Sequence, residues 1–127
     1  MQRLMLAISD HSPRATFLVE SAAMIAGHLK ADWFVVHVRQ PSTLHYRMSA
    51  TEHPVPKEVL SLARRLGAHV IIERGKVADV LVSFARTMSI NYFLTGRSQR
   101  SWVAFAWRLP LVELIKRKLP QAVVMIV

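Results

Sequence analysis

The stretch RLMLAISDHSP, residues 3–13, joins a continuous apolar run to a polar cluster that ends in serine and proline. An apolar run of this length, stopped by polar turn residues, is typical of a buried strand in a parallel sheet. Ser12 followed by Pro13 is typical of a helix start, with serine at the N-cap and proline at the first helical position. The stretch therefore predicts a strand that leads directly into a helix.

The same alternation continues to the end of the chain. Strand-like apolar runs recur at residues 32–38, 68–73, 91–95 and 122–127, and apolar residues recur at helical spacing over residues 13–30, 56–66, 77–85 and 110–118. Gly67 is expected to end the second of these helices, because glycine readily adopts the left-handed conformation of a helix C-cap. We expect an α/β fold with a five-stranded, doubly wound parallel sheet and helices on both faces. Residues 1–127 fit one domain.

The composition restricts the class of protein. The apolar fraction is 52%, which is enough for a sizeable core. No apolar run approaches the roughly 18 residues that a membrane-spanning helix needs, and no secretory signal is present. The absence of cysteine excludes a disulfide framework and a thiolate metal site. These features predict a cytoplasmic protein without a membrane span.

The charge of the chain is strongly positive and unevenly distributed. Seventeen basic and eight acidic residues give a net charge of +9. The region between Gly96 and Leu119 holds six basic residues and one acid, Glu113. The six are Arg97, Arg100, Arg108, Lys116, Arg117 and Lys118. A basic region favours an anionic partner, although a solvated surface that keeps the protein soluble explains the charge equally well.

The expected ligand site lies at the carboxyl ends of the strands. In doubly wound sheets, ligands bind there at the point where the strand order reverses. The loops to consider are those after the first and fourth strands, with residues that suit a polar or anionic ligand. They are Asp10, His11 and Ser12 in the first loop, and Gly96, Arg97, Ser98 and Arg100 in the second. Structural alternatives remain open: Ser12 as a helix cap, Gly96 as a turn glycine and the arginines as a solvated loop.

Several segments resemble a known family. ISDHSP, five alternating strands and a glycine-led loop after the fourth strand resemble the universal stress proteins. LKADWFVVHVRQP (29–41), GRSQRSW (96–102) and PLVELIKRK (110–118) resemble the corresponding domain of KdpD-type osmosensitive potassium sensor histidine kinases. The resemblance implies the Rossmann-like, adenine nucleotide alpha hydrolase-like fold of these proteins. It also implies a non-catalytic sensory domain in two-component signalling linked to potassium or osmotic stress.

The ATP-binding motif of that family is largely lost. Members that bind ATP carry G-x2-G-x9-G-(S/T) from the fourth strand into the last helix, where backbone amides and a hydroxyl hold phosphate. Here Gly96 keeps the first position, Gln99 takes the second, and Leu109 and Pro110 replace the final pair. Proline also removes an amide donor. We therefore expect that ATP, if it is the ligand, is not held in the usual way.

A second motif of the resemblance points to cyclic di-AMP. Some KdpD-type domains carry S-x-S-x20-F-T-A-x-Y, and the spacing fits from Asp10 and Ser12 to Trp33 and His37. Only Ser12 matches in identity. Trp33 and His37 replace the two aromatic residues, but they lie about 13 Å apart along one strand, so one base cannot touch both. His37 is therefore kept as a candidate nucleotide-binding residue, and cyclic di-AMP and ATP remain the candidate ligands.

The sequence gives weaker support for other functions. Trp102, Phe105 and Trp107 fit either packing beneath the loop or a protein-docking surface over residues 97–108. Contact of this loop with an anionic membrane surface is a further alternative. No nucleic-acid motif appears, so we expect no binding of nucleic acid. The six histidines lack metal-ligand spacing and no catalytic constellation is present, so we expect neither a metal site nor enzyme activity.

Two main hypotheses follow, with an ATP-binding universal stress protein as a further alternative. In the first, the chain is a nucleotide-binding sensory domain. In the second, it is a docking or dimerisation module that has lost its ligand. The resemblance implies a homodimer through the final strand, AVVMIV. A chain that begins and ends on strands suggests part of a larger sensor protein, although a free-standing small protein would look the same.

Overall fold

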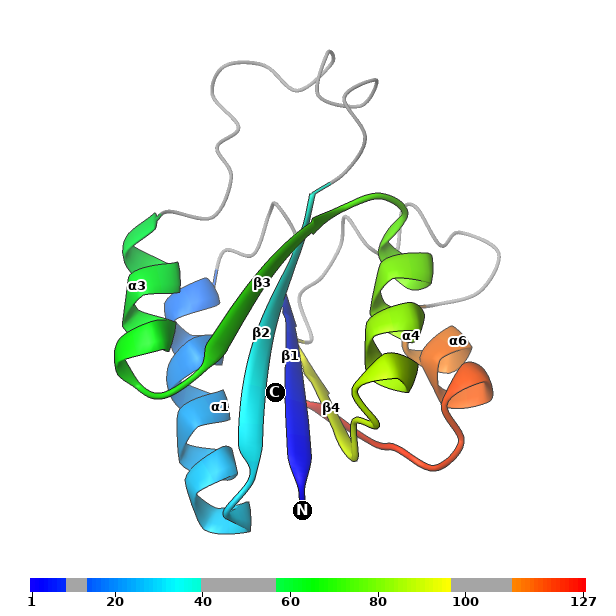
Figure 1. The fold of residues 1–127 in the computed structure, drawn as a ribbon, viewed down its shortest axis with the longest axis horizontal. Coiled ribbons are helices and arrows are strands. Elements are labelled where there is room, and N and C mark those ends of the chain that lie inside the picture. The colour runs from blue at the N-terminus through cyan, green and yellow to red at the C-terminus, as the bar shows by residue number, and fades with distance from the viewer. Residues whose placement is uncertain (9–13, 40–56, 97–110) are drawn as a thin grey trace.

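Five strands and four helices alternate along the described part of the chain (Figure 1). The structure is a computed structural model, and it describes residues 1–8, 14–39, 57–96 and 111–127. The strands are β1 (Arg3–Ile8), β2 (Asp32–Arg39), β3 (His69–Arg74), β4 (Tyr92–Thr95) and β5 (Val123–Ile126). The helices are α1 (Ala15–Leu29), α3 (Lys57–Arg65), α4 (Val77–Thr87) and α6 (Leu111–Lys118).

The strands form one parallel sheet in the order β3-β2-β1-β4-β5. All five carboxyl ends therefore lie along the same edge of the sheet, which we call the carboxyl edge, and the amino ends lie along the amino edge. From β1 the chain first builds outward through β2 and β3, and then returns to the other side of β1 with β4 and β5. The predicted doubly wound parallel sheet is confirmed.

Helices cover both faces of the sheet, as the sequence predicts. Figure 1 shows α1 and α3 on one side and α4 and α6 on the other. Because side chains alternate along a strand, each central strand supplies both cores. In β1, Leu4 and Leu6 belong to the core beneath α1 and α3, whereas Met5 and Ala7 belong to the core beneath α4 and α6. This two-sided burial explains the unbroken apolar runs of the sequence.

The ends of the first two helices differ in how well the sequence predicts them. Gly67 has a φ of 102° and its N–H donates to the carbonyl of Arg64, so the predicted glycine stop of α3 is confirmed. In α1, Arg14 occupies the N-cap position and the helix begins at Ala15, two residues later than expected. Ser12, the expected cap, lies outside the described residues.

The start of β1 is tied to the turn before β4. The backbone N–H of Arg3 donates to Oδ1 of Asn91 at 2.8 Å, and the guanidinium of Arg3 donates to the carbonyl of Met88 at 2.7 Å. Asn91 in turn donates its backbone N–H to the carbonyl of Arg3. These bonds fix β1 and β4 side by side from their first residues.

The two edge strands are β3 and β5, and each leaves apolar side chains half exposed. Ile72 of β3 is 50% exposed, and Val123 and Ile126 of β5 are 53% and 49% exposed. The strand predicted over residues 122–127 is therefore an edge strand. None of the described helices has the length and apolar character that a membrane span requires.

Candidate functional site

The strand order reverses between β1 and β4, and this point on the carboxyl edge is the candidate ligand site. β1 ends at Ile8 and β4 ends at Thr95, followed by buried Gly96. The two strands pair from Leu4 with Tyr92 to Leu6 with Leu94. Continuing this register places Gly96 level with Ile8. The segments predicted to hold the ligand therefore leave the sheet from adjacent points of one edge.

His37 lies one strand away from this point, on β2. It is 3% exposed and pairs in register with Ile8 of β1. It falls on the same face as Trp33 and Val35, which pack in the core beneath α1 and α3. The imidazole therefore lies at the carboxyl edge, on the α1 side of the sheet. A ligand that lies across β1 and β2 at this edge has His37 within its reach.

Trp33 occupies the opposite end of β2. It pairs with Leu4 near the amino edge, is 5% exposed, and packs in the core beneath α1 and α3. A Cβ atom added at Gly67 would lie 3.7 Å from its indole nitrogen. The prediction that one base cannot touch both Trp33 and His37 agrees with this placement, because the two residues sit at different edges of the sheet.

Thr95 is a further candidate residue at the carboxyl edge, and it is not among the residues predicted from the sequence. It is 2% exposed, and its Oγ1 has no hydrogen-bond partner among the described residues. A buried hydroxyl without a partner costs about 1–3 kcal/mol, so an acceptor or donor brought by a ligand would be favourable there. The signal in the sequence is a polar residue that closes an apolar strand directly before a glycine. Thr95 follows the alternation of Phe93 and so faces the core beneath α4 and α6.

Arg39 adds a positive charge at the end of β2. Its backbone carbonyl accepts a hydrogen bond from Gly75 at 2.9 Å, which fixes the end of the strand. Its Nε is buried and has no hydrogen-bond partner within the described residues. Arg39 is not among the candidate residues predicted from the sequence. It supplies a cation at the same edge as His37, and guanidinium groups bind phosphate and carboxylate through paired hydrogen bonds.

The positions of the buried polar residues also indicate the carboxyl edge, independently of the strand order. Across residues 1–8, 14–39, 57–96 and 111–127, the buried polar residues are Ser21, His37 and Thr95. Two of these three end or nearly end a strand at the carboxyl edge. They lie on opposite faces of the sheet, so a common ligand would have to lie over the edge itself.

The candidate residues from the sequence divide into two groups. His37 and Gly96 are described, and both lie at the carboxyl edge. The remaining candidates fall outside the described residues, and their participation stays a prediction. They are Asp10, His11, Ser12, Arg97, Ser98 and Arg100. Among the described residues, no three histidine, aspartate or glutamate side chains form a group that could hold a metal ion.

Comparison with solved structures identifies the fold. No family model matches the sequence, and no curated protein matches it. A universal stress protein in complex with cAMP is similar over 99% of this chain and 95% of its own, with 22% identity and a TM-score of 0.63. The universal stress protein of Archaeoglobus fulgidus in complex with dAMP gives 17% identity, 98% and 97% coverage, and a TM-score of 0.60.

A third structure agrees with these two. A protein of the universal stress protein family from Burkholderia pseudomallei is 18% identical, over 97% of this chain and 94% of its own, with a TM-score of 0.58. Each comparison covers nearly the whole length of both chains. The chain therefore has the fold of the universal stress proteins.

Proposed function

We propose that the chain is a non-catalytic regulatory domain that binds an adenine nucleotide across the carboxyl ends of β1 and β4. The observation that carries the proposal is the adjacency of β1 and β4 at the reversal of strand order, because ligands of open α/β sheets bind at that point. Buried His37 and Thr95 lie at the same edge. The solved structures that contain cAMP and dAMP support an adenine nucleotide as the ligand class.

The finer assignment rests on the sequence resemblance. Segments 29–41 and 110–118 resemble the domain of KdpD-type sensor kinases, so the regulatory role we propose is that of such a sensor in potassium or osmotic signalling. Cyclic di-AMP is the first ligand to test and ATP the second, because the ATP motif retains only Gly96. Arg39 is the described cation nearest in sequence to His37 and is the proposed phosphate contact on β2.

Thr95→Val separates the ligand-binding role of Thr95 from its role in folding. We expect the unliganded variant to unfold at a temperature roughly 3–5 °C higher, because the substitution removes a buried hydroxyl that costs about 1 kcal/mol. We expect its affinity for the nucleotide to fall about three- to tenfold, because a ligand hydrogen bond is lost. Calorimetric titration with cyclic di-AMP and ATP, alongside thermal unfolding, measures both effects.

Thr87→Val is the matched control. Thr87 is exposed at the end of α4, near the amino edge, so its substitution should change neither quantity. A Thr95→Val variant that gains stability and binds nucleotide as tightly as the wild type would contradict a role for Thr95 in binding. No heat with either nucleotide at millimolar concentration would contradict the proposed function itself.

The second candidate function is a dimerisation module, and the chemistry of β5 favours it. β5 is an edge strand without a charged residue, whereas the other edge strand, β3, carries Glu73 and Arg74. Charged side chains on an edge strand oppose pairing with another chain, and an uncharged apolar edge permits it. Pairing of two copies through β5 would cover the half-exposed Val123 and Ile126.

Ile126→Lys and Ile72→Lys form a matched pair for this second candidate. Both isoleucines are on edge strands and about half exposed, at 49% and 50%, so neither lysine should prevent folding. If copies pair through β5, the wild type and Ile72→Lys are dimers by light scattering and Ile126→Lys is a monomer. A wild type that remains a monomer at high concentration would rule out the dimerisation module.

A further inference from the structure

The amino edge of the sheet contains a hollow that the proposed nucleotide site does not use. Its volume is about 420 Å³, within the range of small-molecule sites. It lies where α4 turns into β4 and where α6 turns into β5, at the end of these strands opposite to Thr95 and Gly96. We call it the amino-edge pocket.

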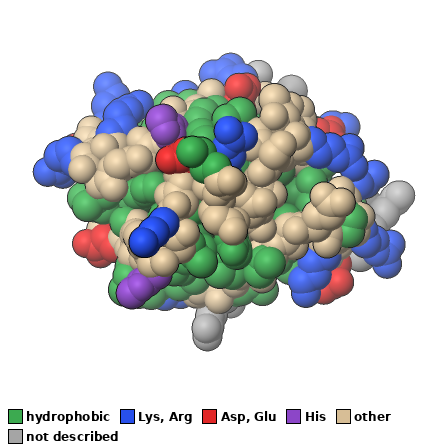
Figure 2. All heavy atoms as spheres, turned by 60° about the horizontal axis from the view of Figure 1, so that its bottom comes forward, with side chains coloured by type: hydrophobic (Ala, Val, Ile, Leu, Met, Phe, Trp, Pro, Cys, Tyr) green, Lys and Arg blue, Asp and Glu red, His purple; other side chains and the backbone are tan. Residues whose placement is uncertain are grey.

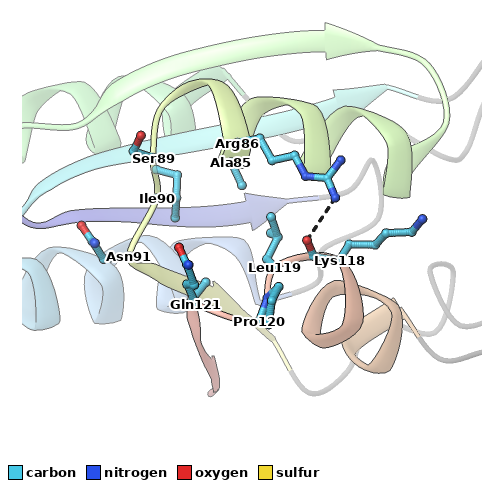
Figure 3. A pocket seen from close by; sticks show the side chains of 10 residues that line it. Ala85, Arg86, Ser89, Ile90, Asn91, Lys118, Leu119, Pro120 and Gln121 are labelled. Carbon is cyan, nitrogen blue, oxygen red and sulfur yellow. Dashed lines mark hydrogen bonds between the residues drawn. The ribbon is translucent and has the colours of Figure 1, made fainter.

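The pocket is lined by apolar and polar residues in equal number, and its two ends differ. In Figure 3, Ile90 and Leu119 lie between a cationic end, with Arg86 and Lys118, and a polar end that includes Asn91 and Gln121. Ile90 and Leu119 are nearly buried, at 8% and 9% exposure, and both belong to the core beneath α4 and α6. This arrangement suits a ligand with an apolar body and one charged group.

The charge of the pocket is positive. Among the described residues that line it there are two cations, Arg86 and Lys118, and no acidic residue. Figure 2 shows the face that comes forward from the bottom of Figure 1, where lysine and arginine side chains lie on both sides of the molecule and some acidic side chains stand beside them. An anionic group placed between Arg86 and Lys118 is attracted by both and meets no carboxylate in the described lining.

A hydrogen bond holds Arg86 in position at this end. Its Nη2 donates to the backbone carbonyl of Lys118 at 3.2 Å, as the dashed line in Figure 3 shows. A guanidinium has five N–H donors, so this bond leaves others for a ligand. At the polar end, Oδ1 of Asn91 already accepts from the N–H of Arg3, which leaves the amide NH₂ group as the donor that Asn91 can offer.

The two helix ends next to the pocket would by themselves disfavour an anion, because the C-terminus of a helix carries partial negative charge. Several of their last carbonyls, however, already accept hydrogen bonds. In α4 the carbonyls of Phe84, Ala85 and Arg86 accept from Met88, Ile90 and Ser89, and in α6 those of Ile115 and Lys118 accept from Leu119 and the Arg86 side chain. Arg86 and Lys118 each add a full positive charge beside helix ends that carry about half a negative charge.

We propose that the amino-edge pocket binds a small organic anion, with its carboxylate or phosphate at Arg86 and Lys118 and its apolar body on Ile90 and Leu119. This site is separate from the proposed nucleotide site, because the two lie at opposite edges of the sheet. A ligand here would contact the turns that precede β4 and β5, and β4 is the strand that ends at Thr95.

Benzoate is the probe for this proposal, with benzamide as its uncharged analogue and inorganic phosphate as an anion without an apolar body. Amide NMR spectra of the whole chain are recorded during each titration at low salt. We expect benzoate to shift the signals of Ser89, Ile90 and Gln121, and to bind at least tenfold more tightly than either other probe. Equal binding of benzamide, better binding of phosphate, or no shift of these signals would overturn the proposal.

Charge variants test the anchoring residues. Lys118→Gln leaves the backbone carbonyl that accepts from Arg86 in place, and we expect it to weaken benzoate binding about three- to tenfold. Combining it with Arg86→Lys, which keeps the charge but loses the paired geometry, should weaken binding further. Arg117→Gln, the matched control on the same helix outside the pocket, should bind benzoate like the wild type. Equal weakening by all three changes would show a general charge effect and overturn the assignment.

Discussion

Phe93→Ala is expected to lower the free energy of unfolding by about 3–5 kcal/mol, the largest effect of any substitution considered. Phe93 lies on β4, is fully buried, and belongs to the core beneath α4 and α6. Removing the ring loses its transfer from water and leaves a cavity that the flanking strands cannot close, because β4 is paired on both sides by β1 and β5. Denaturant unfolding followed by circular dichroism measures the loss.

Phe17→Ala provides the control for the chemical change. Phe17 is 45% exposed on α1, and its described ring contact is with the guanidinium of Arg14, at 4.4 Å. An exposed cation–π contact contributes about 0.5–1 kcal/mol, so this variant should be far less destabilised than Phe93→Ala. Similar losses in the two variants would contradict the position of β4 inside the sheet.

Gly75→Ala is expected to destabilise the protein by about 1–3 kcal/mol, whereas Gly27→Ala should stabilise it by about 0.5–1 kcal/mol. Gly75 has a φ of 146°, and an added Cβ would lie 3.1 Å from Cγ2 of Val80. Its N–H also holds the end of β2 through Arg39. Gly27 lies within α1 with open space around it, so alanine gains helix propensity there without a clash.

Thermal and denaturant unfolding measure the stability of the two alanine variants. The same glycine-to-alanine change is expected to lower the stability at Gly75 and to raise it at Gly27. The pair tests whether the connection from β3 to α4 truly requires a left-handed backbone at Gly75. Destabilisation by Gly27→Ala, or an unchanged stability in Gly75→Ala, would be inconsistent with the backbone conformations described above.

The architecture could be predicted from the sequence because parallel strands buried on both faces leave continuous apolar runs. β1, β2 and β4 are such strands, and the helices between them show clear apolar spacing. Gly67 was equally predictable, because a glycine after a periodic segment is the usual helix stop. Lys30 and Ser89 were not. Both residues have a left-handed backbone conformation, with φ near 50°, although neither is glycine. The local sequence does not indicate this conformation.

The candidate site was only partly predictable. The rule that ligands bind where strand order reverses indicated the ends of the first and fourth strands, and these strands are adjacent as expected. The sequence did not predict Thr95 and Arg39 as candidate site residues, because threonine and arginine at a strand end are usually solvated. Only the three-dimensional structure shows that Oγ1 of Thr95 and Nε of Arg39 are buried. The amino-edge pocket was also hidden, since Arg86 and Lys118 are 32 residues apart.

The most direct test of the central claim is an amide NMR titration of the wild-type protein with cyclic di-AMP and with ATP. We expect one nucleotide to shift the signals of Ile8, His37 and Gly96 most strongly, because they surround the reversal of strand order at the carboxyl edge. The signals of Ser89 and Gln121 at the amino edge should move little. No shift with either nucleotide at millimolar concentration, or shifts confined to Ser89 and Gln121, would contradict nucleotide binding at the carboxyl edge.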